Sequence, residues 1–162
     1  KLYLLRDHGR DKEGQVVAWG YNSRLDNLQA AVLDFKLRSY PSEVVRRREV
    51  ARMYQEGLGD LSEVDLPPSP DSDSRHFDVY QNYELETDRR DDFREYLGQR
   101  GIGTIIQWGG TPLHHLKKLG FTADLPGTDR FFQRCVMLPM NRAVSDDDVA
   151  YIVDTVRAFH RG

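Results

Sequence analysis

Polar side chains stand next to glycines in three short segments, RDHGR (6–10), GYNSR (20–24) and QWGGTPLHH (107–115). Glycine lets a backbone come close to a ligand, and surface loops carry many of the side chains that bind ligands. The amides, imidazoles and guanidinium groups of these segments suit anions or hydroxyls. Each of these residues, taken singly, is also a common cap or turn former. The residues alone therefore indicate a candidate anion or sugar site and no particular reaction.

Other chemistries are disfavoured by spacing. The glycines of RGIGTIIQWGG (100–110) follow a predicted helix and precede a predicted strand, which is the reverse of the order in a dinucleotide-binding fingerprint. His114 and His115 are adjacent and lack the spacing of zinc ligands, so we predict no metal site. The basic run 46–48 has acidic neighbours and no interleaved aromatic residues, which is typical of a solvated helix face and not of a nucleic-acid site.

Composition limits the class of protein. The chain has 162 residues, 39% of them hydrophobic, and a formal net charge of -3, which is typical of one soluble globular domain. Its single cysteine, Cys135, lies in the apolar run CVMLPM and is predicted to be core, and no internal disulfide is possible. With no membrane-length apolar run and no secretory leader, we predict a cytoplasmic protein. The opening KLYLLRDHG suggests either a piece of something longer or a trimmed boundary of a complete domain.

Two helical segments are predicted in the first part of the chain. A helix begins after Ser23 or Asp26 as N-cap, and Pro41 should break or kink it. A second segment then continues to Gly57 or Gly59, so that the two may form one long kinked element. The apolar side of the first helix is predicted to face a core and carries Leu25, Leu28, Val32 and Phe35.

A proline-rich connector, LPPSPDSDSR (66–75), divides the chain. The order predicted after it is strand 79–86, helix 89–99, strand 103–108 and strand 135–138. A final helix begins at Ser145, whose hydroxyl caps it. Its apolar face carries Val149, Ile152, Val153, Val156 and Phe159. This order predicts a small α/β domain in which helices cover a sheet.

The order of the motifs adds a resemblance to a known family. RDHGR, GYNSRLDNLQAA, RRREVARMYQEGL, RRDDFREYLGQRGIGT, PLHH, VMLPM and SDDDVAYIVDTVRAF resemble, in this order, the C-terminal portion of the DegT/DnrJ/EryC/StrS-type nucleotide-sugar aminotransferases. These enzymes have the aspartate-aminotransferase fold (fold type I), use pyridoxal 5'-phosphate and convert a nucleotide-linked keto sugar to an amino sugar. They are dimers with active sites at the subunit interface, so the resemblance implies a homodimer.

The resemblance also implies a domain organisation. Residues 1–66 would be the interdomain segment with the long kinked linking helix, and residues 67–162 the C-terminal small domain, an α/β (α+β) unit with a small antiparallel or mixed sheet covered by helices. The N-terminal domain that carries the cofactor would be absent from this chain.

The family places candidate site residues on this sequence. Asn22 matches the asparagine that reaches across the dimer to the cofactor phosphate, and an amide donor suits that role without adding a full charge. Arg24 either contacts a phosphate of the nucleotide sugar or pairs with Asp26. Trp108 and His114 are predicted to bind the sugar nucleotide, the indole covering a sugar face and the imidazole bonding a hydroxyl or pyrophosphate oxygen. The alternative is that Trp108 is core and His114 a loop cap.

No catalytic residue is predicted in this chain, because transamination needs a lysine to hold the cofactor and that lysine lies upstream in the family. None of the chain's lysines matches its context: Lys1, Lys12, Lys36, Lys117 and Lys118. The isolated chain is therefore expected to be inactive, while the intact protein is predicted to be an aminotransferase. The alternatives are a dehydratase of the same family, with histidine in place of that lysine, or a non-catalytic dimerisation or regulatory fragment.

The segment IIQWGGTPLHHLKKLGF gives a clue to the substrate. It resembles the branch of the family that acts on dTDP-linked 3-keto-6-deoxyhexoses, in deoxyamino-sugar and antibiotic biosynthesis. After the two glycines this chain has Thr111 and Pro112, where those relatives differ, which leaves the exact sugar open. Glutamate is the common amino donor of the family.

Overall fold

A computed structural model describes residues 1–161 and divides the chain into two compact units, Lys1–Pro41 and Ser42–Gly162. The elements are α1 (Leu2–Arg6), α2 (Asn27–Leu37), α3 (Tyr40–Leu58), β1 (Val64–Asp65), β2 (Tyr83–Thr87), α4 (Arg90–Gly98), the 3-10 turns η1 (Gln107–Gly110), η2 (Leu113–His115) and η3 (Lys117–Leu119), α5 (Pro126–Arg134), β3 (Cys135–Leu138) and α6 (Asp146–Arg161). The α/β fold class predicted from the sequence is confirmed. The boundary between the compact units falls in the first turn of the long helix α3, whereas the predicted division at residues 66 and 67 stays a prediction about the intact protein.

In the first unit, α2 begins where the sequence predicts. The side chain of Asp26 accepts a hydrogen bond from the backbone N–H of Gln29 at 2.8 Å, so Asp26 and not Ser23 is the N-cap. The helix ends before Pro41, whose ring falls in the first turn of α3. A proline in the first turn costs no hydrogen bond, because that N–H would lack a helical partner in any case. The predicted break is confirmed.

The apolar side of α2 is exposed, and the prediction that it faces a core is wrong for this chain. Leu28 is 77% exposed and Phe35 is 74% exposed, and α2 has no buried residue. The spacing of these residues is helical, as predicted, but no element of the first unit packs over them. Periodicity identifies the helix and the side that needs a cover, without saying which part of the protein supplies the cover.

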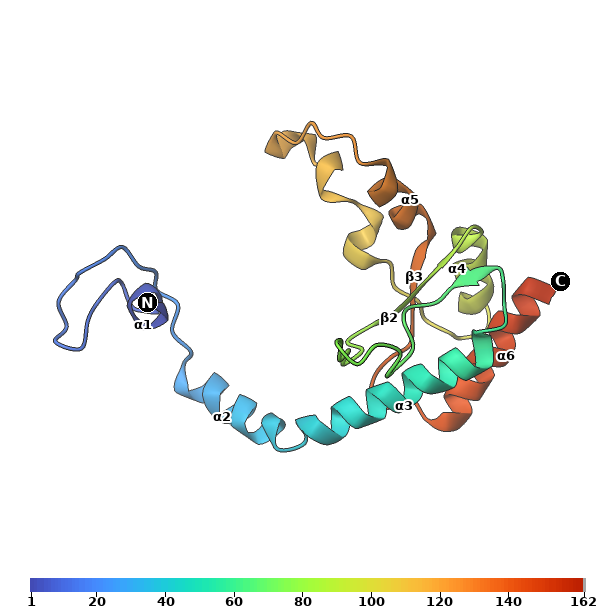
Figure 1. Ribbon diagram of the computed structural model, residues 1–162, viewed down its shortest axis with the longest axis horizontal. Helices are drawn as coiled ribbons and strands as arrows, with labels where there is room; N and C mark the ends of the chain where they lie inside the picture. Colours follow the sequence, from blue (N-terminus) through green and yellow to red (C-terminus); the bar gives the residue numbers. More distant parts are fainter. Residues whose placement is uncertain (162) are drawn as a thin grey trace. The chain divides into compact units, whose positions relative to one another are not determined.

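In the second unit, a three-stranded antiparallel sheet in the order β1-β2-β3 lies beside the helices (Figure 1). Val64 of β1 lies opposite Thr87 of β2, and Tyr83 of β2 lies opposite Leu138 of β3. Alternate residues of β2 are buried, among them Tyr83 and Leu85, as a strand with one core face requires. The sheet has no parallel pair among the described residues, which decides between the antiparallel and mixed alternatives.

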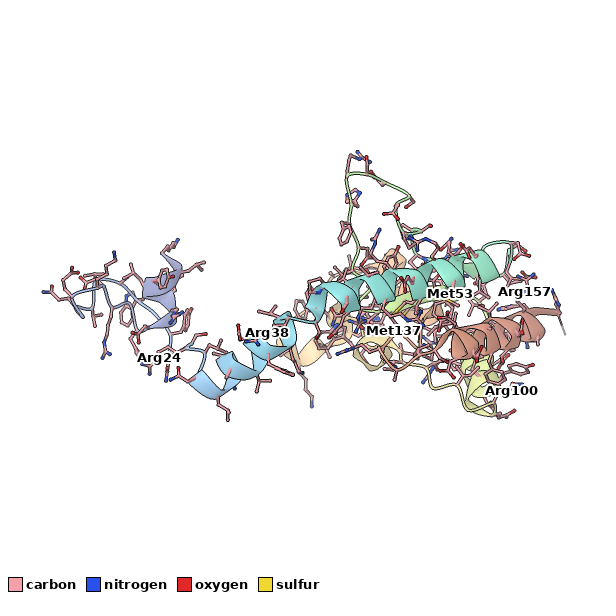
Figure 2. The ribbon with its side chains drawn as sticks, turned by 90° about the horizontal axis from the view of Figure 1, so that it is seen from below. Arg24, Arg38, Met53, Arg100, Met137 and Arg157 are labelled. Atoms are coloured by element: carbon pink, nitrogen blue, oxygen red, sulfur yellow. The ribbon has the colours of Figure 1, made fainter. Side chains whose placement is uncertain are left out.

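Helices α3, α4 and α6 supply the rest of the core. Tyr54 of α3 packs against Tyr83 of β2 with ring centroids 4.8 Å apart, and Phe93 of α4 packs against Phe159 of α6 at 5.3 Å. Arg157 of α6, labelled in Figure 2, donates a hydrogen bond of 2.7 Å to the carbonyl of Gly57 and ties α6 to the end of α3. The core is therefore closed by long-range contacts between elements from both ends of this unit.

Helix α6 is capped by Ser145, as predicted, and the structure shows that the cap is reciprocal. The hydroxyl of Ser145 accepts a hydrogen bond from the backbone N–H of Asp148, and the Asp148 carboxylate accepts from the N–H of Ser145 at 2.9 Å. Four of the five residues predicted for its apolar face are buried, and Val153 is partly buried; the four are Val149, Ile152, Val156 and Phe159.

The segment between α4 and β3 departs from the prediction. Instead of a strand at 103–108, only Ile105 bridges to Met137 of β3, and the chain then turns into η1. Consecutive glycines at 109 and 110 with positive φ angles turn the backbone away from the sheet edge. Helix α5, which the sequence analysis did not predict, follows and leads directly into β3. This irregular segment shapes the candidate site described below.

The basic run at 46–48 is not a solvated face, which corrects the sequence prediction. Arg46 pairs with Asp146 at 2.7 Å, and Arg47 donates a hydrogen bond to the carbonyl of Gln81 at 2.8 Å. Arg48 is buried and bonds to Asp71 in the proline-rich connector. Charge patterning alone misses this role because these partners lie far away in the sequence. The three arginines fasten α3 to the start of α6, to the loop at Gln81 and to the proline-rich connector.

Cys135 is buried in β3, as predicted, and burial raises the pKa of its thiol to about 11. The thiol therefore stays protonated at neutral pH and serves packing. Among residues 1–161, no helix combines the length and apolar character needed to cross a bilayer.

Candidate functional site

The first group of candidate residues lies where two loops of the N-terminal unit run side by side. Asp7 and Asn22 form an antiparallel bridge, and the backbone N–H of His8 donates to the carbonyl of Tyr21 at 3.0 Å. The N–H of Ser23 donates to the carbonyl of Arg6 at 2.9 Å. The segments RDHGR and GYNSR, which the sequence analysis treated separately, are thus joined through their backbones.

Two glycines make this close approach possible. Gly9 has a φ of +73°, and a Cβ placed on it would lie 1.7 Å from the carbonyl oxygen of Ala18. A Cβ on Gly20 would lie 2.2 Å from the backbone nitrogen of Gly9. Any other side chain at either position would force the loops apart. The glycines next to the polar residues therefore have a structural reason that does not itself involve a ligand.

Asn22 and Arg24 present their side chains on the surface of this unit. Asn22 is exposed, and its amide makes no side-chain hydrogen bond within the described residues. Arg24 pairs with Asp7, with 3.5 Å between Nη1 and Oδ1, so the alternative pairing with Asp26 is wrong. Asp26 is occupied as the cap of α2. The amide of Asn22 therefore has no partner within the described residues, and the guanidinium of Arg24 is only weakly paired. The two residues lie two positions apart in the sequence, and both side chains can bind an anion.

The second group lies in the other unit, on the irregular segment after Ile105. Trp108 is 80% exposed and has φ and ψ of 50° and 30°. The left-handed conformation costs a residue other than glycine on the order of 1–3 kcal/mol, which the surrounding structure must offset. The alternative that Trp108 is a core residue is therefore wrong. An exposed indole held in an unfavourable backbone conformation is an observation that points to a binding role.

Trp108 and His114 line the same cavity, whose volume is about 550 Å³. Its wall is formed by Trp108, Thr111, Leu113, His114, Leu116, Leu125, Thr128 and Phe132. Most of these side chains are apolar, and the polar groups among them are two hydroxyls, one imidazole and the indole N–H of Trp108. Such a cavity suits a ligand with an apolar face and a few hydroxyls better than it suits a bare anion.

His114 is 5% exposed and is held by a carboxylate. Its Nε2 lies 2.9 Å from Oδ1 of Asp129, a residue of α5. His115, whose side chain is half exposed, places its own Nε2 2.8 Å from the same oxygen. Since His114 bonds to a side chain and not to a backbone group, the loop-cap alternative does not describe it. The sequence analysis missed Asp129, because only α5 brings it beside the histidines.

The three groups are of the types that bind zinc, and their ligand atoms all lie within 4.8 Å of one another. The two N–O separations nevertheless favour hydrogen bonds. Ligand atoms on one tetrahedral zinc ion, at metal–ligand distances near 2.1 Å, stand about 3.3 Å apart. His114 and His115 are closer than that to Asp129, at distances normal for an N–H donor and a carboxylate. The arrangement is that of a carboxylate that orients two imidazoles.

Comparison with known proteins identifies the family of the chain. The model of the DegT/DnrJ/EryC1/StrS aminotransferase family matches residues 1–157. The chain belongs to this family. It is 32% identical over 162 residues to the dTDP-3-amino-3,4,6-trideoxy-alpha-D-glucose transaminase of Streptomyces venezuelae, covering 97% of this chain and 41% of that protein. It is 29% identical to the dTDP-3-amino-3,6-dideoxy-alpha-D-galactopyranose transaminase of Aneurinibacillus thermoaerophilus, covering 98% of this chain and 43% of that protein.

A solved structure gives the same result for the fold. The crystal structure of S. venezuelae DesV matches 99% of this chain and 43% of its own chain, with a TM-score of 0.88 and 31% identity. The chain thus has the fold of a portion of the DegT/DnrJ/EryC1/StrS aminotransferases, and it spans less than half the length of the relatives that it matches.

Proposed function

We propose that the intact protein is a pyridoxal 5'-phosphate-dependent aminotransferase that converts a dTDP-linked 3-keto-6-deoxy sugar to the amino sugar. The observation that carries the proposal is the family match over residues 1–157. The two relatives named above are described as transaminases of dTDP-3-amino sugars, which supports the nucleotide and the position of the amino group. In this proposal glutamate supplies the amino group and leaves as 2-oxoglutarate, so the amino group and the keto oxygen change places.

One residue of this chain, Asn22, is suited to bind the phosphate of the cofactor. The exposed amide of Asn22 has no side-chain partner within the described residues and can donate to a phosphate oxygen. When bound, the cofactor supplies an electron sink for exchanging an amino group and a proton. Asn22 of one subunit would hold its phosphate in the site of the neighbouring subunit. The lysine that binds the cofactor covalently belongs to another part of the intact protein.

The sugar nucleotide would be bound by the second group of residues. In this proposal the indole of Trp108 covers one face of the sugar, and the apolar wall of the cavity accommodates the methyl group at carbon 6. His114 bonds to a hydroxyl. Arg24 would bind a phosphate of the nucleotide. Its guanidinium is available for this because its contact with Asp7 is long and its own side chain is half exposed.

The exposed side of α2 supports the proposed homodimer. Large apolar side chains on this short helix meet water in the isolated chain, and such a patch is typical of a surface that another part of an assembly covers. The side chains are Leu28, Val32, Leu33, Phe35 and Leu37. We propose that the remainder of the protein and the second subunit cover this helix. In the sequence, the helix begins shortly after the loop that bears Asn22.

An assay of the intact protein tests the proposal. Purified protein would be incubated with glutamate and with dTDP-3-keto-6-deoxyglucose generated in situ, and the products identified by mass spectrometry. The expected result is the 3-amino sugar together with 2-oxoglutarate. Borohydride should attach the cofactor to a lysine outside this chain, and the 162-residue chain treated in the same way should acquire no stoichiometric adduct.

Each other outcome contradicts a defined part of the proposal. Preferential amination of the 4-keto isomer would overturn the assignment of carbon 3. Loss of water from the sugar without amination would indicate the dehydratase alternative. An intact protein that does not retain the cofactor would indicate a non-catalytic member of the family.

A further inference from the structure

We infer that Asp129 is a positioning residue that holds His114 as a hydrogen-bond acceptor for a hydroxyl of the sugar. The inference rests on the proposed function and deepens it, since it assigns a proton position to the imidazole and thereby selects which group of the substrate that imidazole can bind.

Two elements hold the imidazole of His114 in place, the turn η2 that bears it and helix α5 that bears Asp129. His114 follows Pro112 in the short turn η2 and is almost fully buried, whereas Asp129 lies in the first turn of α5. The backbone of α5 is in turn fastened to the sheet side of the unit, because Arg90 of α4 donates a hydrogen bond to the carbonyl of Phe132. The carboxylate is therefore part of a fixed element and the imidazole cannot turn without losing its contact.

The carboxylate determines which ring nitrogen carries the proton. An ionised carboxylate only accepts hydrogen bonds, so the Nε2 of His114, 2.9 Å from Oδ1, must be the protonated nitrogen. In the neutral imidazole Nδ1 is then an acceptor. Nδ1 has no partner among the described residues, and His114 lines the cavity.

An acceptor nitrogen discriminates between the two candidate groups of the substrate. A sugar hydroxyl can donate to Nδ1, whereas the pyrophosphate oxygens of a nucleotide sugar are ionised at neutral pH and can only accept. Two acceptors facing each other repel. The structure therefore favours the hydroxyl over the pyrophosphate as the partner of neutral His114, a choice that the sequence leaves open.

The test uses Asp129→Asn and Asp129→Glu in the intact enzyme. An asparagine can donate to Nε2 and so stabilise the opposite tautomer, whereas glutamate keeps an acceptor. We expect Asp129→Asn to lower kcat/KM for the nucleotide sugar about 10- to 100-fold, by analogy with the loss of a group that orients a metal-binding histidine. The half-reaction with glutamate should stay unchanged, and Asp129→Glu should restore a large part of the loss.

Three further measurements separate positioning from general damage. Asp124→Asn, the same change at an exposed position of the neighbouring loop, should leave kcat/KM unchanged. Affinity for dTDP without sugar should be equal in the wild type and in Asp129→Asn. NMR spectra of enzyme labelled with 15N-histidine should show the proton of His114 on Nε2 in the wild type and on Nδ1 in a substantial fraction of Asp129→Asn, with His114→Gln providing the assignment.

The outcomes are distinguishable from failure of the proposed function. Wild-type-like kcat/KM in Asp129→Asn, a wild-type proton on Nδ1, or a selective loss of dTDP affinity would each overturn the role of Asp129 while the enzyme still makes an amino sugar. Absence of any amino-sugar product from the wild type would instead contradict the proposed function itself.

Discussion

Arg24 pairs with Asp7 across the joined loops of the N-terminal unit, with 3.5 Å between Nη1 and Oδ1 and with both side chains more than one third exposed. An ion pair of this kind contributes about 0–1 kcal/mol. Oδ1 of Asp7 is itself buried and has no hydrogen-bond partner among the described residues, so an anion that replaces Asp7 must bind the guanidinium more strongly than Asp7 does. Arg24 either binds a phosphate of the nucleotide sugar or only pairs within the chain, and the two roles predict different effects of substitution on KM.

We predict that Arg24→Gln raises KM for the nucleotide sugar about tenfold or more in the intact enzyme, because a hydrogen bond to a charged group contributes about 1.5–3 kcal/mol. Asp7→Asn should change KM by less than about twofold, since it removes only the weak pair. Steady-state kinetics at constant ionic strength measures both. Equal effects of the two variants would mean that Arg24 only ties the loops together.

For Asn22, the prediction concerns retention of the cofactor. Asn22→Ala in the intact enzyme should weaken binding of pyridoxal phosphate by about 1–3 kcal/mol, because a phosphate oxygen loses its donor. Asn27→Ala provides the matched control, since Asn27 is an exposed amide in the first turn of α2 and Asp26 already caps that helix. Equilibrium dialysis with absorbance detection compares the two. Unchanged affinity in Asn22→Ala would remove the proposed role.

The same residue tests the homodimer. If Asn22 acts on the site of the neighbouring subunit, mixing Asn22→Ala with a variant that lacks the cofactor lysine should give heterodimers in which one site has both groups intact. Activity should then exceed that of either parent protein. A mixture with no recovered activity, in samples where exchange of subunits is demonstrated by mass, would place both groups in one subunit.

How much the sequence predicts depends on the range of the interactions concerned. Local rules offer Asp26 beside Ser23 as the cap of α2, and they find the break at Pro41 and the cap at Ser145, because each depends on residues within one helical turn. The apolar face of α2 is also found by its spacing, but whether that face is covered depends on parts of the protein that are not neighbours in the sequence.

The candidate site shows the same limit. Trp108 and His114 stand out by type and by the adjacent glycines, whereas Asp129 gives no local signal and is brought to His114 by α5. The apolar residues of 103–108 fit a strand, but the chain forms η1 from Gln107, and Trp108, Gly109 and Gly110 in it all have positive φ. The prediction fails where the backbone leaves regular structure to form the cavity.

Trp108→Gly separates binding from packing at the cavity. Glycine adopts the left-handed conformation without the penalty of about 1–3 kcal/mol, and the exposed indole buries little surface, so we expect thermal stability to be unchanged or raised. The kcat/KM for the nucleotide sugar should fall, while the half-reaction with glutamate stays constant, because the effect is confined to one substrate. Calorimetry and single-turnover kinetics measure the two properties. A large loss of stability, of the 3–5 kcal/mol expected for a core tryptophan, would indicate packing instead.

His160 predicts a dependence of stability on pH. Its Nε2 is buried without a hydrogen-bond partner, and its ring lies 4.9 Å from that of Phe159 and 5.7 Å from that of Phe93. Burial lowers the pKa of His160 below its ordinary value of 6.5, with the charge of Arg89 acting in the same direction and that of Glu63 opposing it. The folded chain therefore holds the imidazole neutral in a range of pH where the unfolded chain binds a proton.

This difference in proton binding determines how the free energy of unfolding changes with pH. Stability from neutral His160 is fully present above pH 6.5 and is lost as the pH falls from 6.5 toward the lower pKa of the folded state, because protons then favour the unfolded chain. In His160→Leu this part of the pH dependence should be absent. Urea unfolding followed by circular dichroism, at several values from about pH 8 to about pH 5, gives the free energy of unfolding of both proteins. The difference between wild type and variant should shift in favour of the variant as the pH falls, and a difference that is constant over this range would show that His160 keeps its ordinary pKa in the folded protein.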